Sequence, residues 1–194
     1  MTQIIGILNI TPDSFSDGGQ FNSTKKALQQ ARALFANGAN LIDVGAESTK
    51  PGAKTVAPLA EWGRMAEFWI GVNAADDLDI KKFSLDTRNP QTAQNFLELG
   101  GTIINDVSGF KDLAMIERAA KFEATCIVNH FPGGTVDEVH EQKICSIDEV
   151  KNDLLSRASK MMEQGIAREK IVLDPGIGFG KTEDLNWQLL KFAK

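Results

Sequence analysis

The chain has 194 residues, of which 42% are hydrophobic, and a formal net charge of -5 at pH 7. This size allows one well-packed core, and the acidic balance without a basic cluster argues against a nucleic-acid partner. No apolar run approaches the about 20 residues that cross a membrane. Cys126 and Cys145 are too few for a disulfide framework, so we expect a cytoplasmic protein.

Six short, largely apolar runs predict six strands, and the first of them carries several β-branched residues. They lie at residues 4–9, 41–44, 83–86, 102–106, 125–130 and 171–174. The first run, Ile4-Ile5-Gly6-Ile7-Leu8-Asn9, ends where a loop with Pro12, Gly18 and Gly19 begins. Its composition predicts a strand that is buried on both faces.

A helix is predicted after each strand. The expected helices run from Ser23 or Thr24 to about Asn37, from about Pro58, from Pro90 to Leu99, from about Leu113 to Lys121, after a cap at Ser146, and from Asp184. In the second we expect Trp62, Met65, Phe68 and Trp69 to point inward. In the fifth, the expected buried stripe is Val150, Leu154, Ala158, Met161 and Met162.

Polar side chains stand at the ends of five of these strands: Asn9, Asp86, Asn105, Asn129 and Asp174. Consecutive strand–helix units imply parallel strands with right-handed crossovers. A doubly wound sheet concentrates its chemistry at one switch point, whereas polar groups at many strand ends are typical of a TIM (β/α)₈ barrel. We therefore predict an α/β fold of this barrel type, with six of its eight units, in a single domain over residues 1–194.

Carboxylates and carboxamides without a cluster of His or Cys suit a flat, nitrogen-rich ligand that is held by its edge. An Asp accepts two parallel hydrogen bonds from an amidine-like edge, and an Asn both donates and accepts. The alternative is that each of these groups only caps a neighbouring loop. His130 is expected to pack at its strand end. Phe179, in the glycine-rich stretch after Asp174, offers a surface on which a ring can pack.

The sequence resembles the dihydropteroate synthase family of pterin-binding enzymes. Four segments carry the resemblance: Gly6-Ile7-Leu8-Asn9-Ile10-Thr11-Pro12-Asp13-Ser14-Phe15-Ser16-Asp17-Gly18-Gly19, Ile42-Asp43-Val44-Gly45-Ala46-Glu47-Ser48-Thr49-Lys50-Pro51-Gly52, Ile103-Ile104-Asn105-Asp106 and Leu173-Asp174-Pro175-Gly176-Ile177-Gly178-Phe179-Gly180-Lys181. The resemblance implies a (β/α)₈ barrel and a transferase of folate biosynthesis. Its substrates would be p-aminobenzoate and 6-hydroxymethyl-7,8-dihydropterin pyrophosphate, and its cofactor Mg²⁺.

Position by position, the resemblance implies roles for residues at strand ends and in the first two loops. Asp86, Asn105 and Asp174 would bind the pterin, Asn9 would be linked to Mg²⁺, and Thr49 would lie near the substrate. Asp13 would lie near the reacting methylene, and Ser14, Phe15 and Pro51 would enclose p-aminobenzoate. Lys50 stands where the family usually has Arg, which keeps the charge but loses the bidentate fork, and Asn129-His130-Phe131 replaces a Met-His-Met-like stretch.

The family's motifs at the seventh and eighth strands, of Ser-Arg-Lys and Arg-x-His type, have no counterpart in these 194 residues. We therefore expect little or no synthase activity from this polypeptide by itself, and a homodimer where the barrel is complete. Two alternatives stay open. One is a pterin-binding protein of the methyltetrahydrofolate-methyltransferase kind, and the other is a non-catalytic pterin-binding module.

Overall fold

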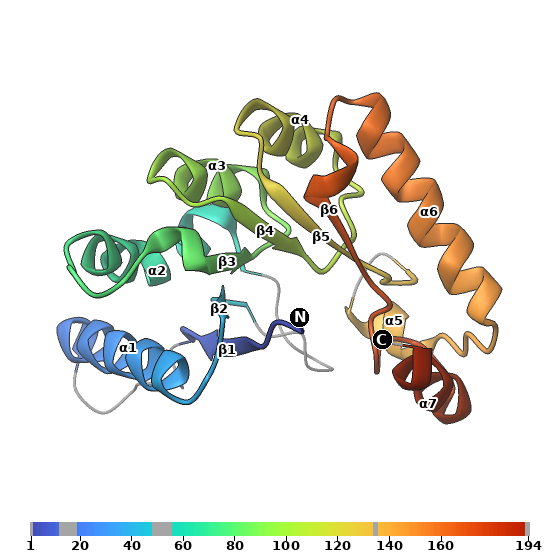
Figure 1. The fold of residues 1–194 in the computed structure, drawn as a ribbon, viewed down its shortest axis with the longest axis horizontal. Coiled ribbons are helices and arrows are strands. Elements are labelled where there is room, and N and C mark those ends of the chain that lie inside the picture. The colour runs from blue at the N-terminus through green and yellow to red at the C-terminus, as the bar shows by residue number, and fades with distance from the viewer. Residues whose placement is uncertain (1, 12–18, 48–55, 134–135, 193–194) are drawn as a thin grey trace. The chain divides into compact units, whose positions relative to one another are not determined.

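The structure is a computed structural model that describes residues 2–11, 19–47, 56–133 and 136–192. Figure 1 labels its helices and strands. The described residues form two compact units, one up to Asn105 and one from Asp106 onward. Each unit consists of strand–helix repeats, as the sequence predicts, and each is described by itself below.

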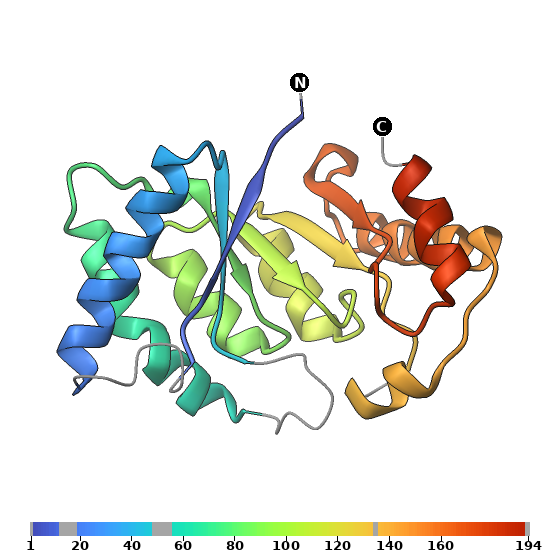
Figure 2. The same ribbon diagram turned by 90° about the horizontal axis from the view of Figure 1, so that it is seen from below.

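The first unit contains four parallel strands in chain order, β1 (Ile5–Asn9), β2 (Leu41–Gly45), β3 (Phe83–Asp86) and β4 (Ile103–Asp106), the last of which ends in the first residue of the second unit. Three helices, α1 (Gly19–Ala36), α2 (Pro58–Asn73) and α3 (Pro90–Glu98), pack on one face of these strands (Figures 1 and 2). A short 3₁₀ turn, η1 (Ile80–Lys82), leads into β3. The predicted strands and helices of this unit are confirmed, with ends that shift by a few residues.

An aromatic cluster fills the space between the helices and strands of the first unit. Trp69 packs against Phe96 with ring centroids 4.6 Å apart and planes tilted by 50°, and it meets Phe83 edge-on at 5.8 Å. Phe68, at 5.0 Å from Trp69, is also buried. Met65, Phe68 and Trp69 are buried as predicted, but Trp62 is only partly buried, because its neighbour Glu61 occupies the buried position. Rings in edge-to-face contact add about 0.5–1.5 kcal/mol per pair to the gain from burial.

The prediction that the first strand is buried on both faces is wrong. Leu8 is 3% exposed, but Ile5 is 43% and Ile7 70% exposed. Side chains alternate between the faces of a strand, and only the face that carries Leu8 is covered by helices. The opposite face of β1 carries Ile5, Ile7 and Asn9, and it is open.

The second unit contains two parallel strands, β5 (Thr125–Asn129) and β6 (Ile171–Asp174). Its helices are α4 (Leu113–Lys121), α5 (Val136–Glu141), α6 (Ile147–Glu163) and α7 (Glu183–Phe192), and a 3₁₀ turn, η2 (Arg168–Lys170), precedes β6. The helix α5 lies between the fifth predicted strand and the helix cap at Ser146, where the sequence predicts no helix. None of the described helices is long and apolar enough to cross a membrane.

The predicted start of α6 is confirmed, because Ser146 is its N-cap and accepts a hydrogen bond from the backbone N–H of Glu149. Val150, Leu154, Ala158 and Met161 of the predicted stripe are buried. Met162 is 41% exposed, so its place in the stripe is wrong. Its neighbour Met161 already occupies the buried position, and consecutive helical residues point about 100° apart.

Candidate functional site

The ends of β1 to β4 place four residues of the first unit in one register row. Asn9 pairs with Gly45, Gly45 with Asp86, and Asp86 with Asn105. Three predicted site residues therefore lie on adjacent or nearly adjacent strands at one edge of the sheet. Gly45 makes room for this arrangement, since a Cβ atom there would lie 2.9 Å from Oδ2 of Asp86.

Asp43 lies on β2, two residues before Gly45 of this row. It is not among the residues predicted from the sequence. Its Oδ2 accepts a hydrogen bond of 2.8 Å from Nδ2 of Asn105. Its Oδ1 accepts one of 2.5 Å from the hydroxyl of Ser84. A charge inside an otherwise apolar strand, two residues before Gly45, is the signal that could have revealed it.

The contact with Asp43 fixes how the carboxamide of Asn105 is oriented. Because Nδ2 donates to Asp43, Oδ1 points the other way, and this buried oxygen has no hydrogen-bond partner among the described residues. A buried acceptor without a partner costs about 1–3 kcal/mol. The arrangement therefore leaves one acceptor of Asn105 unpaired among the described residues.

The loop that follows Asp86 is tied to the start of α2 by the buried carboxylate of Glu61. The hydroxyl of Thr87 donates to Glu61 at 2.9 Å, and Nδ2 of Asn89 donates at 2.8 Å. Burial raises the pKa of Glu61, and these hydrogen bonds oppose that rise. The ties fix the backbone directly after Asp86.

In the second unit, Asp174 ends β6 and pairs in register with Asn129 at the end of β5. Oδ1 of Asp174 accepts a 2.8 Å hydrogen bond from the backbone N–H of Gly176. Oδ2 accepts a 3.3 Å hydrogen bond from Nδ2 of Asn129. A carboxylate oxygen can accept more than one hydrogen bond, so Asp174 is held in place by these two and retains acceptor capacity.

The aromatic side chain of Phe179 packs against Phe131, with ring centroids 5.4 Å apart. Phe131 is buried and Phe179 is partly buried. Lys111 lies over the Phe131 ring and donates to the carbonyls of Phe131 and Gly133. This contact is within the protein, so the role of Phe179 as a surface for a substrate ring stays a prediction.

His130 is 3% exposed, which agrees with its predicted place at the strand end. Its Nε2 lies 3.9 Å from Oδ2 of Asp153, an oxygen that also accepts from Nε of Arg157. Burial lowers the pKa of His130 to about 4, and the nearby charges of Lys181 and Arg157 act in the same direction. His130 is therefore neutral at pH 7.

Six predicted site residues lie outside the described residues: Asp13, Ser14, Phe15, Thr49, Lys50 and Pro51. Among the described residues, no group of three or more His, Cys, Asp or Glu side chains could hold a metal ion. Asn9, the residue that the resemblance links to Mg²⁺, is exposed at the end of β1. A single amide oxygen beside substrate phosphates fits the way in which Mg²⁺ binds, because this ion keeps several waters and takes few protein ligands.

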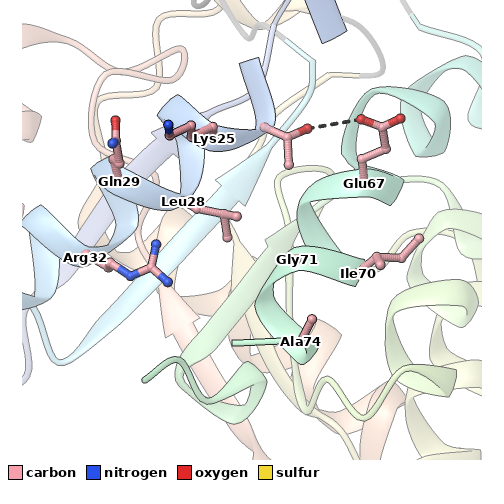
Figure 3. A pocket seen from close by; sticks show the side chains of 9 residues that line it. Lys25, Leu28, Gln29, Arg32, Glu67, Ile70, Gly71 and Ala74 are labelled. Atoms are coloured by element: carbon pink, nitrogen blue, oxygen red, sulfur yellow. Dashed lines mark hydrogen bonds between the residues drawn. The ribbon is translucent and has the colours of Figure 1, made fainter. Parts of the chain in front are cut away.

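A separate hollow of about 490 Å³ lies between α1 and α2, on the helical side of the first unit (Figure 3). Gly71 of α2 allows close approach there, since a Cβ atom would lie 2.9 Å from Leu28. Across the hollow, Thr24 donates to Glu67, and Arg32 is paired with Asp77. None of the predicted site residues that the structure describes lines this hollow.

Parallel β/α units with carboxylates and carboxamides at the strand ends are the features of a pterin-binding barrel enzyme. The family described as "Pterin binding enzyme" matches residues 5–194, and the chain belongs to this family.

Within that family the similar proteins are dihydropteroate synthases. The chain is 40% identical to the dihydropteroate synthase of Clostridium beijerinckii over 190 residues, which are 97% of this chain and 67% of that protein. The structure of the Clostridium difficile enzyme in the presence of pteroic acid superimposes with a TM-score of 0.86 at 37% identity, over 98% of this chain and 70% of that one. The structure of the Anaplasma phagocytophilum enzyme with bound 6-hydroxymethylpterin monophosphate superimposes with a TM-score of 0.81 at 34% identity, over 98% of this chain and 72% of that one. The predicted fold class is confirmed.

Proposed function

We propose that this protein is a dihydropteroate synthase of folate biosynthesis. In this reaction the bond between the pterin's methylene carbon and its pyrophosphate oxygen breaks, and pyrophosphate leaves with the electron pair. The dihydropterin ring spreads the positive charge that remains. The amino nitrogen of p-aminobenzoate then bonds to the methylene carbon and loses a proton. No protein nucleophile is required, and the residues proposed to bind the pterin, Asp86, Asn105 and Asp174, are hydrogen-bonding groups.

The observation that carries the proposal is the orientation of Asn105 beside Asp86. Oδ1 of Asn105 is a buried acceptor without a partner, and Asp43 holds the carboxamide in this orientation. The amino group and ring N–H of a pterin edge supply donors of the kind that this oxygen lacks. We propose that Asp86 accepts from the same ligand edge.

Asp174 is the third proposed pterin residue. Its two anchoring hydrogen bonds leave acceptor capacity on both carboxylate oxygens, which suits a bidentate contact with an amidine-like edge. We propose that Phe179 supplies a surface on which a substrate ring packs. The support is its partial burial and its packing on Phe131.

The proposed roles of the first two loops come from the resemblance alone. Asp13 and Thr49 are proposed to lie at the reacting centre, Ser14, Phe15 and Pro51 around p-aminobenzoate, and Lys50 among the substrate-binding residues. We propose that Asn9 contributes an oxygen ligand to Mg²⁺, whose other ligands would be substrate phosphate and water. When bound, the ion neutralises charge on the leaving pyrophosphate.

We propose a cytoplasmic location for the protein. The support is Cys126, a buried free thiol whose pKa is raised by burial to about 12, since free thiols persist in the reducing cytoplasm. A homodimer is proposed for the protein with a complete barrel. Light scattering on the purified protein measures this directly.

Two measurements on the same preparation test the proposed function. One is calorimetric titration with 6-hydroxymethylpterin, and the other is pyrophosphate release from the dihydropterin pyrophosphate with and without p-aminobenzoate. Pterin binding together with p-aminobenzoate-dependent release identifies the synthase. Binding without release in a preparation with a complete barrel identifies a pterin-binding module or a methyltransferase-like protein, and absence of binding overturns all three.

A further inference from the structure

Lys181 follows the glycine-rich turn after β6, and its side chain reaches back to that turn. Its Nζ donates to the carbonyl of Gly176 at 2.7 Å and to that of Phe179 at 2.9 Å. It also donates to the carbonyl of His130 in the loop after β5, at 3.3 Å. An ammonium group has three N–H donors, and in Lys181 each of them has a backbone carbonyl as its acceptor.

The backbone of Lys181 is itself anchored. It forms a parallel bridge with Ile144, where the N–H of Ile144 donates to Gly180 and the N–H of Thr182 donates to Ile144, both at 2.9 Å. The ammonium group therefore extends from a fixed backbone. It ties two loops together at one point.

The turn that Lys181 holds has a backbone shape that is specified closely by its glycines. Gly176 has φ +64°, and a Cβ atom there would lie 2.3 Å from the carbonyl oxygen of His130. Gly180 has φ +61°, and its Cβ would lie 2.5 Å from the carbonyl oxygen of Val139. Glycine enters such conformations without steric cost but is also free to leave them. A turn of this kind needs an external tie to stay in one shape.

We propose that Lys181 is a positioning residue for the pterin site, one that fixes the turn carrying Asp174 and Phe179 and does not itself contact substrate. The inference rests on the proposed function, because it is the proposed roles of Asp174 and Phe179 that make the turn important. The N–H of Gly176, whose carbonyl Lys181 binds, also donates to Oδ1 of Asp174. Lys181 thereby acts on the carboxylate of Asp174 through Gly176, whose carbonyl accepts from Lys181 and whose N–H donates to Asp174.

The electrostatic surroundings agree with a buried structural cation. Burial lowers the pKa of Lys181 to about 8, and the charges of Asp174 and Asp153 oppose the lowering. These carboxylates come from β6 and α6, and His130 and Arg157 lie in the same cluster. At pH 7 the ammonium form holds the three carbonyls.

Hydrogen exchange tests the positioning role without any ligand. The reporters are the amides of Gly176, Gly178 and Phe179, which donate to Asp174, Asn186 and Gly176. In Lys181→Met these amides should exchange about tenfold faster or more, because three acceptors lose their donor. In Lys181→Arg, which keeps a charge and several N–H donors, the rates should return toward those of the wild type.

Two controls separate a local effect from a general loss of stability. Lys191→Met makes the same chemical change at an exposed position of α7, and the amides of α4 report on the rest of the unit. If Lys181→Met does not fold, Lys181→Gln keeps two N–H donors and should give an intermediate rate at the same amides. Unchanged exchange in the turn, or equal acceleration in α4, overturns the proposal.

Titration with 6-hydroxymethylpterin completes the test. Under conditions where every variant is folded, Lys181→Met should bind about tenfold more weakly than the wild type, and Lys181→Arg should recover affinity. If the turn loosens but the wild type binds no pterin, the proposed function fails and the tie by Lys181 stands. If the wild type binds and Lys181→Met binds equally well, the positioning role fails and the function stands.

Discussion

The role of Asp43 gives the sharpest single prediction, since the residue was found only from the structure. In Asp43→Asn the shape of the side chain is kept and its charge is lost. A hydrogen bond to a charged group contributes about 1.5–3 kcal/mol and a neutral one about 0.5–1.5 kcal/mol. Two such hydrogen bonds, from Ser84 and Asn105, are affected. The expected loss is therefore about 2 kcal/mol in the free energy of unfolding.

The same substitution should weaken binding of 6-hydroxymethylpterin about tenfold, because Asn105 no longer has a fixed donor–acceptor orientation. Urea unfolding measures the first effect and calorimetry the second. Asp76→Asn makes the same change at an exposed position of the first unit and should alter neither quantity. If Asp43→Asn unfolds with the free energy of the wild type and binds pterin with the same Kd, the assigned orientation of Asn105 is refuted.

Two further predictions concern the second unit. Asp174→Asn should cost about 2–4 kcal/mol of pterin affinity through a mismatched donor pair and a lost charge-assisted hydrogen bond. The same change at the exposed Asp184 should leave the affinity unaltered. Equal affinities of Asp174→Asn and the wild type, measured by calorimetry, would contradict this. His130 has a folded pKa of about 4 against an ordinary value of 6.5, so the unfolded chain takes up this proton first as pH falls. About 3 kcal/mol of stability should therefore be lost between pH 6.5 and 4. The free energy of unfolding of His130→Asn should lack this part of the pH dependence, and that of His140→Asn should retain it. Identical pH profiles of the unfolding free energy for the wild type and His130→Asn would refute the lowered pKa of His130.

The features that sequence predicted well are those that local chemistry determines. Short runs that stop at Asn or Asp predicted where β1, β3, β4 and β6 end, whereas β5 ends at Asn129, one residue before its predicted end. Ser146 predicted the start of α6, because an N-cap hydroxyl serves only its own helix. The polar residues at strand ends, among them Asp86 and Asp174, were predicted from the same signal, because they are the residues at which these runs stop.

The features that sequence missed depend on contacts between distant segments. Ile7 has the composition of a buried residue, but no local signal says which face of β1 has a covering layer. Asp43 lies within an apolar run, and its importance comes from Ser84 and Asn105 on two other strands. Lys181 stands in a glycine-rich stretch whose sequence does not show what its side chain contacts. Its three carbonyl acceptors come from two different loops, one after β5 and one after β6.

The central claim is that the strand ends of this protein bind a pterin edge through an acceptor that is already in place. Calorimetric titration of 6-hydroxymethylpterin into the wild type and into Asn105→Ala tests it most directly. The account predicts saturable binding at one site per chain in the wild type and at least about tenfold weaker binding in a folded Asn105→Ala. Absence of saturable binding to the folded wild type, or equal affinity of the two proteins, would contradict it.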